Sequence, residues 1–140
     1  MLMNGPIALG ATTVLMPRFD LVKALALIKK HHVTVLYVVP PIVLAFVNDP
    51  AVETADLSSV RFALSGAAPL SNELQRAFEK RTGIPCNKGY GLTETSPIVS
   101  CNPIHKIKVE TVGPPFKGNK VKIAQDGEIL VKGENVMLGY

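Results

Sequence analysis

The stretch GYGLTETSP, residues 89–97, combines small, aromatic, hydroxyl and acidic side chains in one short segment. Gly89 and Gly91 let the main chain approach a ligand closely, because neither carries a Cβ. Tyr90, which stands between them, provides a ring face on which a base could stack. The first half of the stretch therefore indicates a backbone cradle with an aromatic platform.

The second half of the stretch suits a phosphate and its metal ion. Thr93 and Thr95 can hydrogen-bond a phosphate, and Glu94 is a hard oxygen ligand of the kind that Mg²⁺ takes beside phosphate oxygens. The chain contains no G-x-x-x-x-G-K-[ST] sequence, so this is not a Walker loop. Base platform, phosphate donor and metal carboxylate together predict a nucleotide site. The alternative is an ordinary capped turn with a satisfied threonine.

A second stretch, SGAAP at residues 65–69, has almost no side chains. A flat ligand could lie against the backbone of Gly66, Ala67 and Ala68. The same residues would also suit a tight turn from a strand into a helix. Taken alone, the stretch favours the turn.

Alternating strand and helix patterns position both stretches. The expected strands span residues 11–17, 33–39, 60–65 and 85–88. The expected helices follow Asp20, Pro41 and Ser71, and the last of them stops at Gly83. His31 and His32 fall in the last turn of the first helix and indicate a helix end rather than ligands. This alternation predicts an α/β fold with a doubly wound, mostly parallel sheet and flanking helices.

Ligands of such sheets bind beyond the carboxyl ends of the strands, and both stretches directly follow an expected strand. The strand 33–39 is continuously apolar, as expected for one buried on both faces. The placement of both stretches at one edge of the sheet strengthens the prediction of a ligand site.

The pattern changes in the last third of the chain. Two alternating segments, 119–125 and 127–133, flank Asp126-Gly127, which predicts an antiparallel hairpin with a two-residue turn. We therefore expect two subdomains. Residues 1–105 would form the C-terminal part of an α/β nucleotide- and acyl-binding unit, and residues 106–140 the start of a small β-barrel.

Composition narrows the class of protein. The 140 residues are 47% hydrophobic with a net charge of +4, but the basic residues are scattered and aromatic residues are few, which argues against a nucleic-acid surface. The apolar run 33–47 is too short to cross a bilayer, and no signal-peptide pattern opens the chain. Cys86 and Cys101 lack metal-ligand spacing and are expected as buried thiols in a reducing compartment. We expect a cytoplasmic protein without a transmembrane segment.

Three ordered motifs carry a resemblance to a known family. SGAAPLSNEL, GYGLTETSP and GEILVKGENVMLGY resemble, in this order and spacing, the adenylate-forming superfamily of acyl-CoA synthetases, coumarate-CoA ligases and luciferases. The resemblance covers essentially the whole chain, including VPPIVLAF and DLSSVRFALSG. It implies that residues 89–97 hold the adenylate.

The resemblance also implies residue roles. Tyr90 would stack on adenine, Thr93 would contact the α-phosphate and Glu94 would hold Mg²⁺, which makes Thr93 and Glu94 the catalytic candidates. Ala67 and Ala68 would border adenine and the acyl group. The full set expected at the nucleotide comprises Gly66, Ala67, Ala68, Lys88, Gly89, Tyr90, Gly91 and Thr93.

The implied reaction has two half-steps. A carboxylate attacks the α-phosphate of ATP to give acyl-AMP and pyrophosphate, and coenzyme A then displaces AMP to form a thioester. Leu64, Ala67, Ala68, Pro97 and Ile98 would form an apolar acyl wall. Burial of each methylene against such a wall contributes roughly 0.8 kcal/mol, which favours medium- or long-chain fatty acids.

Three alternatives remain open. They are an aryl-acid ligase resembling coumarate-CoA ligases, an adenylation domain that loads a carrier protein, and a non-catalytic nucleotide-binding module. The family's phosphate loop, ribose-binding aspartate and C-terminal catalytic lysine do not occur in this sequence. We therefore expect an internal segment of the large N-terminal domain, inactive by itself and prone to self-association.

Overall fold

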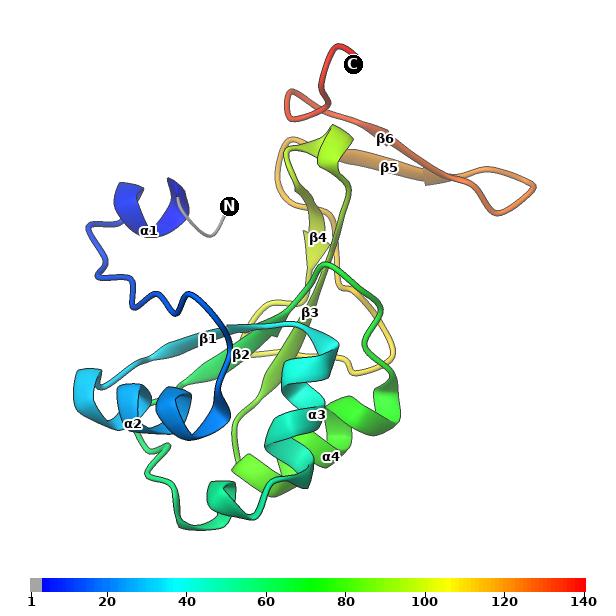
Figure 1. Ribbon diagram of the computed structural model, residues 1–140. Helices are drawn as coiled ribbons and strands as arrows, with labels where there is room; N and C mark the ends of the chain where they lie inside the picture. The colour runs from blue at the N-terminus through cyan, green and yellow to red at the C-terminus, as the bar shows by residue number, and fades with distance from the viewer. Residues whose placement is uncertain (1–3) are drawn as a thin grey trace.

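A four-stranded sheet and a two-stranded sheet organise the computed structural model, which describes residues 4–140 (Figure 1). The larger sheet has the order β1-β2-β3-β4. Its strands are β1 (Val35–Val38), β2 (Phe62–Ser65), β3 (Cys86–Gly91) and β4 (Ile98–Cys101). The first three strands are parallel, and β4 returns antiparallel to β3. The expected α/β class with a mostly parallel sheet is confirmed.

The helices are α1 (Asn4–Ala8), α2 (Leu21–His31), α3 (Pro40–Asn48) and α4 (Asn72–Thr82), with the short 3₁₀ turns η1 (Pro50–Thr54) and η2 (Thr93–Thr95). Helices α3 and α4 connect the parallel strands, whereas η2 joins β3 to the antiparallel β4. The expected caps are present: the Asp20 carboxylate accepts from the Lys23 N–H at 3.0 Å, and the Ser71 hydroxyl accepts from the Leu74 N–H at 3.1 Å. His32 ends α2 in a left-handed conformation, which confirms the prediction of a helix end.

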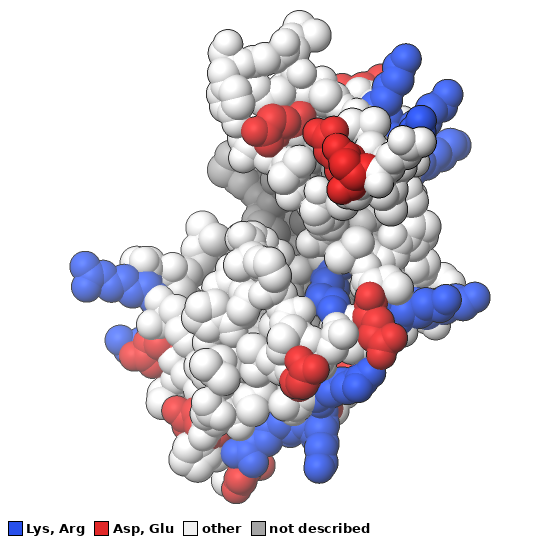
Figure 2. Space-filling view, turned by 90° about the vertical axis from the view of Figure 1, so that its right-hand side faces the viewer, with Lys and Arg blue, Asp and Glu red and all other residues white. Residues whose placement is uncertain are grey.

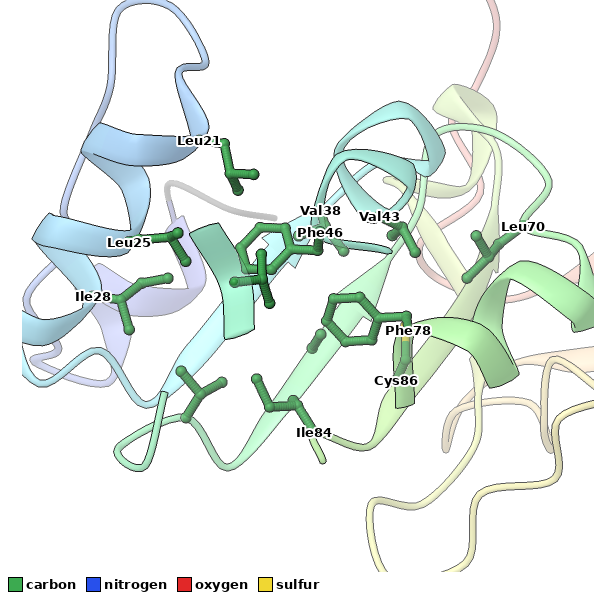
Figure 3. Packing of buried hydrophobic residues seen from close by; sticks show 13 residues of the cluster. Leu21, Leu25, Ile28, Val38, Val43, Phe46, Leu70, Phe78, Ile84 and Cys86 are labelled. Atoms are coloured by element: carbon green, nitrogen blue, oxygen red, sulfur yellow. The ribbon is translucent and has the colours of Figure 1, made fainter. Parts of the chain in front are cut away.

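The hydrophobic core lies between the sheet and helices α2, α3 and α4 (Figure 3). Phe46 of α3 and Phe78 of α4 meet edge to face, with ring centroids 5.7 Å apart. Both rings are almost fully buried, beside Cys86 of β3 and Val38 of β1. This packing fixes the strands whose carboxyl ends carry the two glycine-containing stretches.

Two expectations about the sheet were wrong. Residues 11–17 form no strand: in the described structure this segment pairs with no other strand, and Leu15 is 82% exposed. The strand β1 is not buried on both faces, since Tyr37 is 44% exposed. The packed helices cover one face, and Tyr37 pairs with Leu64 on the other.

The smaller sheet consists of β5 (Lys120–Ile123) and β6 (Ile129–Lys132), which pair antiparallel as expected. The turn differs from the prediction, because five residues, 124–128, separate the paired strand ends Ile123 and Ile129. Gly127 adopts a φ of 91° there and donates its N–H to the Ala124 carbonyl at 3.1 Å. Basic side chains project at the level of this hairpin (Figure 2), whose strands contain Lys120, Lys122 and Lys132.

The two sheets are joined through β4 and the residues that follow it. Ser100 forms a bridge with Pro115, and the Phe116 N–H donates to the Val99 carbonyl at 2.9 Å. Within residues 4–140, no helix has the length and apolar character needed to span a membrane.

Candidate functional site

The stretch GYGLTETSP forms the end of β3, the turn η2 and the link into β4, and so the tip of a β3–β4 hairpin that rises toward β5 and β6 (Figure 1). Gly89 pairs with Cys101 and Tyr90 with Ser100. The expectation of an irregular segment after a short strand was therefore wrong for residues 89–91. They extend β3, because β4 supplies a pairing partner that has no obvious strand signature.

Gly91 occupies the closest approach inside this hairpin. A Cβ at this position would overlap the backbone carbonyl of Pro97, so only glycine fits without a shift of the main chain. The strand register also shifts between Tyr90 and Gly91. Gly91 thus lets the two arms close above the sheet, as a tight backbone cradle requires.

The tip of the hairpin is held by Thr95. Its hydroxyl accepts from the Leu92 N–H at 3.0 Å and donates to the Pro97 carbonyl at 3.1 Å. Thr95 is 3% exposed, so the expectation that it could bind a phosphate was wrong. Its hydroxyl bonds locally instead, and it shapes the tip together with Ser96, which has a φ of 48°.

Thr93 and Glu94 remain accessible on the same tip. Thr93 is exposed and Glu94 is half-buried. A hydrogen bond from its own backbone N–H, and secondly one from the Tyr140 hydroxyl at 2.8 Å, hold the pKa of Glu94 below its ordinary value of 4.5. The carboxylate is therefore ionised at neutral pH. An exposed hydroxyl and an ionised carboxylate on adjacent residues suit a phosphate with its cation.

The stretch SGAAP lies at the carboxyl end of β2, as expected. Ser65 pairs with Lys88 of β3, so residues 66–68 follow directly beside the start of the hairpin. The Gly66 N–H donates to the Val38 carbonyl at 3.3 Å, and Ala67 adopts a φ of 67°. The structure therefore brings both stretches to one edge of the parallel sheet.

Lys88 and Tyr90 are both half-buried in β3. The Lys88 ammonium donates to the Asn72 side-chain oxygen at 2.7 Å, at the start of α4. Because this amine already has a partner in α4, any bond from it to a ligand would have to compete with Asn72.

The residues of the expected acyl wall separate into two groups. Leu64 and Ile98 both lie 3.9 Å from the place where a Cβ of Gly89 would stand. Ala67, Ala68 and Pro97 are exposed. A half-buried aliphatic surface thus exists around Gly89, on the face of the sheet that the helices do not cover.

The described residues contain no group of three or more His, Cys, Asp or Glu side chains that could hold a metal ion by themselves. Mg²⁺ commonly binds through one or two carboxylates, with substrate phosphates and water completing its octahedron. Glu94, ionised and accessible, fits this single-carboxylate mode. A magnesium ion here would depend on the phosphates of a bound nucleotide.

Two cavities of about 330 and 490 Å³ lie elsewhere. Both are lined by Gly83 and Ile84, which precede β3, and so lie at the opposite end of the strand from the hairpin tip. The edge of the sheet that carries the two stretches is therefore separate from both cavities.

Sequence reasoning missed the contacts that the C-terminal residues make with the hairpin. The Asn135 side-chain amide donates to the Thr95 carbonyl at 2.6 Å, and the Met137 N–H donates to the Glu94 carbonyl at 2.8 Å. Tyr140 adds the bond to Glu94 described above. No local pattern could reveal these contacts, since they join residues about 40 positions apart.

The whole chain, residues 1–140, matches the AMP-binding enzyme family, and the chain belongs to that family. It is 38% identical to the probable 4-coumarate–CoA ligase 2 of Dictyostelium discoideum, over 94% of this chain and 26% of that protein. The chain thus spans about a quarter of this relative's length.

Solved structures share the fold. The anthranilate CoA ligase AuaEII in complex with anthranoyl-AMP superposes with a TM-score of 0.81 and 26% identity, over 91% of this chain and 27% of that one. The O-succinylbenzoate coenzyme A synthetase MenE of Bacillus subtilis, in complex with ATP and magnesium ion, gives a TM-score of 0.79 and 27% identity, over 96% and 30% of the respective chains. These similarities confirm the resemblance carried by the three motifs.

Proposed function

We propose that the complete protein containing this chain is an AMP-forming acid–thiol ligase. It activates a carboxylic acid with ATP and transfers the acyl group to coenzyme A. The observation that carries the proposal is the β3–β4 hairpin, which starts beside residues 66–68 and presents accessible Thr93 and ionised Glu94 at its tip. The 4-coumarate–CoA ligase named among the relatives supports this reading.

The nucleotide binds along this edge. The small residues 66–68 leave room for a flat base, and the Tyr90 ring packs against it. The Thr93 hydroxyl donates to an oxygen of the α-phosphate. Lys88 lies at the base of the hairpin, where its bond to Asn72 sets the position of its charge near the nucleotide.

Glu94 is the residue of this chain that holds Mg²⁺ on the phosphates. When bound, the ion would neutralise phosphate charge and, as a Lewis acid on the phosphate oxygens, make the α-phosphorus more electrophilic. The Glu94 carboxylate is ionised at neutral pH, and the hydrogen bonds that it accepts lower its pKa further below 4.5. A rigid tip matters because phosphoryl and adenylyl transfer depend mainly on positioning and charge stabilisation.

The reaction proceeds in two balanced steps. An oxygen of the substrate carboxylate attacks the α-phosphorus of ATP, the bond to the β-phosphate oxygen breaks, and pyrophosphate leaves. The coenzyme A sulfur, as thiolate, then attacks the acyl carbonyl carbon of acyl-AMP, and AMP leaves with the electron pair of the acyl–oxygen bond. In the first step Thr93 and Glu94 stabilise the charge that develops on the phosphate oxygens.

We propose an aryl acid as the substrate class, with a medium- or long-chain fatty acid as the second candidate. Leu64 and Ile98 flank Gly89, where the absence of a side chain leaves a flat strip suited to a planar ring. The names of the relatives, which include 4-coumarate and anthranilate ligases, favour the aryl acid. The same apolar surface would also accept an alkyl chain, which was the expectation from the sequence.

Pyrophosphate release by the complete protein tests the proposal. The assay would contain ATP, Mg²⁺ and one acid at a time from matched panels of cinnamic-type acids, fatty acids and amino acids, with and without coenzyme A. We expect release with aryl acids and a thioester only when coenzyme A is present. A preference for amino acids would favour a carrier-loading domain, and ATP binding without release would favour a non-catalytic module.

A further inference from the structure

The hairpin tip is held only in part by bonds within it. The 3₁₀ turn η2 is three residues long; the Thr95 N–H donates to the Leu92 carbonyl and the Ser96 N–H to the Thr93 carbonyl, and the Thr95 hydroxyl adds its local bonds to Leu92 and Pro97. Such short turns have poor hydrogen-bond geometry and gain their order from their surroundings. The orientation of Thr93 and Glu94 therefore depends on what the outward carbonyls of the turn contact.

Both of those carbonyls bind the segment that follows β6. The Met137 N–H donates to the Glu94 carbonyl at 2.8 Å, and the Asn135 side-chain amide donates to the Thr95 carbonyl at 2.6 Å. The same amide lies 3.5 Å from the Ile98 carbonyl. Asn135 thus spans Ser96 and Pro97 and connects the end of the turn to the first residue of β4.

The orientation of the Asn135 amide is set by these two carbonyls. Its side-chain oxygen is buried without a hydrogen-bond partner among the described residues. A Cβ at Gly133 would come within 2.6 Å of that oxygen, so Gly133 leaves the space in which the amide sits. The amide nitrogen faces two acceptors, and the opposite orientation would place three oxygens together.

We propose that Asn135 is a positioning residue for acid activation, because its amide fixes the turn that presents Thr93 and Glu94 to the nucleotide. This inference rests on the proposed function. Asn135 does not touch the reacting atoms; it acts through the carbonyls of Thr95 and Ile98. A displaced turn would misplace the phosphate-binding groups, and a misplacement of about 1 Å can cost on the order of 100-fold in rate.

Asn119 provides a matched control. Its side-chain amide donates to the Val99 carbonyl of β4 at 3.3 Å, and its side-chain oxygen also lies beside the Cβ position of Gly133. The Val99 carbonyl has a second donor, the Phe116 N–H at 2.9 Å. Loss of the Asn119 amide therefore leaves that carbonyl bonded, whereas Asn135 is the donor to the Thr95 carbonyl in the described structure.

The test uses the complete enzyme and two half-reactions. Acid-dependent ATP–pyrophosphate exchange reports activation, and thioester formation from supplied acyl-AMP and coenzyme A reports the second step. We expect Asn135→Asp and Asn135→Leu to lower the exchange rate at saturating Mg·ATP by about 10- to 100-fold. Thioester formation should fall by less than about 3-fold, and Asn135→Gln, which keeps an amide donor, should recover most of the exchange.

Asn119→Asp should leave the exchange rate within about 3-fold of wild type, since its acceptor keeps a donor. Thermal unfolding establishes that each variant is folded. If Asn135→Asp does not fold, the comparison is made with Asn135→Leu. Equal losses in both half-reactions, or equal losses in the Asn119 and Asn135 variants, would overturn the inference. If the wild type is active and the Asn135 variants are unaffected, the inference about Asn135 is overturned and the proposed function stands. If the wild type shows no exchange, the proposed function is overturned as well.

Discussion

Gly91 and Pro97 lie so close across the β3–β4 hairpin that a Cβ on residue 91 would overlap the Pro97 carbonyl oxygen. We expect Gly91→Ala to destabilise the chain by about 1–3 kcal/mol, as overpacking does elsewhere. Chemical denaturation measures the change. Gly66→Ala is the matched control, because nothing lies within 4 Å of the added methyl group. Similar stabilities for the two variants would show that the hairpin does not close as described.

Glu94 and Tyr140 should titrate as partners. The Tyr140 hydroxyl donates to the Glu94 carboxylate, which raises the pKa of Tyr140 above 10.0 and contributes to lowering that of Glu94 below 4.5. The pKa of Glu94 is lowered first by its own backbone N–H and secondly by Tyr140, so these two bonds stabilise the fold above pH 4.5 and are lost as the pH falls through the folded-state pKa. The raised tyrosine pKa means that the bond from Tyr140 stabilises the fold below pH 10 and is lost as the pH rises further.

Carbon-13 NMR titrations of labelled Tyr and Glu residues check both shifts. In the Glu94→Gln variant the pKa of Tyr140 should return toward 10.0. In the Tyr140→Phe variant the pKa of Glu94 should rise, although its own backbone N–H still holds it below 4.5. Unchanged titrations in both variants would show that the two groups do not meet in solution.

The two cysteines should differ in reactivity. Burial, and secondly the charge of Glu79, raise the pKa of the Cys86 thiol to about 12, and Cys86 has no exposed surface. Cys101 is half-buried, and burial raises its pKa as well. Because the thiolate is the reactive form, a thiol reagent at pH 8 should label Cys101 first and Cys86 only after unfolding.

A Cys101→Ser variant isolates the second thiol. It should show no rapid labelling in the native state and one labelled thiol in denaturant. Rapid native labelling of this variant would contradict the buried position of Cys86. The expectation from the sequence, two buried thiols, held for Cys86 and was wrong for Cys101, which is partly exposed at the end of β4.

The sequence predicts this fold best where the signal is local. Asp20, Ser71 and Gly83 cap helices through bonds that span three or four residues, so side-chain type and spacing reveal them. Residues 11–17 show the limit of such patterns. Their β-branched and aliphatic side chains suit a strand, but a strand also needs a neighbour for its backbone groups, and the described structure offers none.

The candidate site shows the same division. Tyr90, Thr93 and Glu94 could be selected from their chemistry, and the register between β2 and β3 places the start of their hairpin beside residues 66–68. The pairing that extends β3 through Gly91, the local bonds of Thr95 and the Asn135 amide all depend on segments brought together by folding. Residue type alone therefore identifies the accessible ligand-binding candidates, but not the residues that hold them in position.

Acid-dependent ATP–pyrophosphate exchange by the complete protein, compared between Glu94→Gln and Glu128→Gln, tests the central claim most directly. Glu128 is an exposed carboxylate in the loop between β5 and β6, far along the chain from the hairpin tip. We expect Glu94→Gln to lower the exchange rate by about 10²- to 10³-fold, comparable to the loss of one preorganised charge-stabilising group. Glu128→Gln should exchange like wild type. Wild-type exchange in the Glu94→Gln variant would contradict the claim that this hairpin binds the nucleotide's phosphates and their cation.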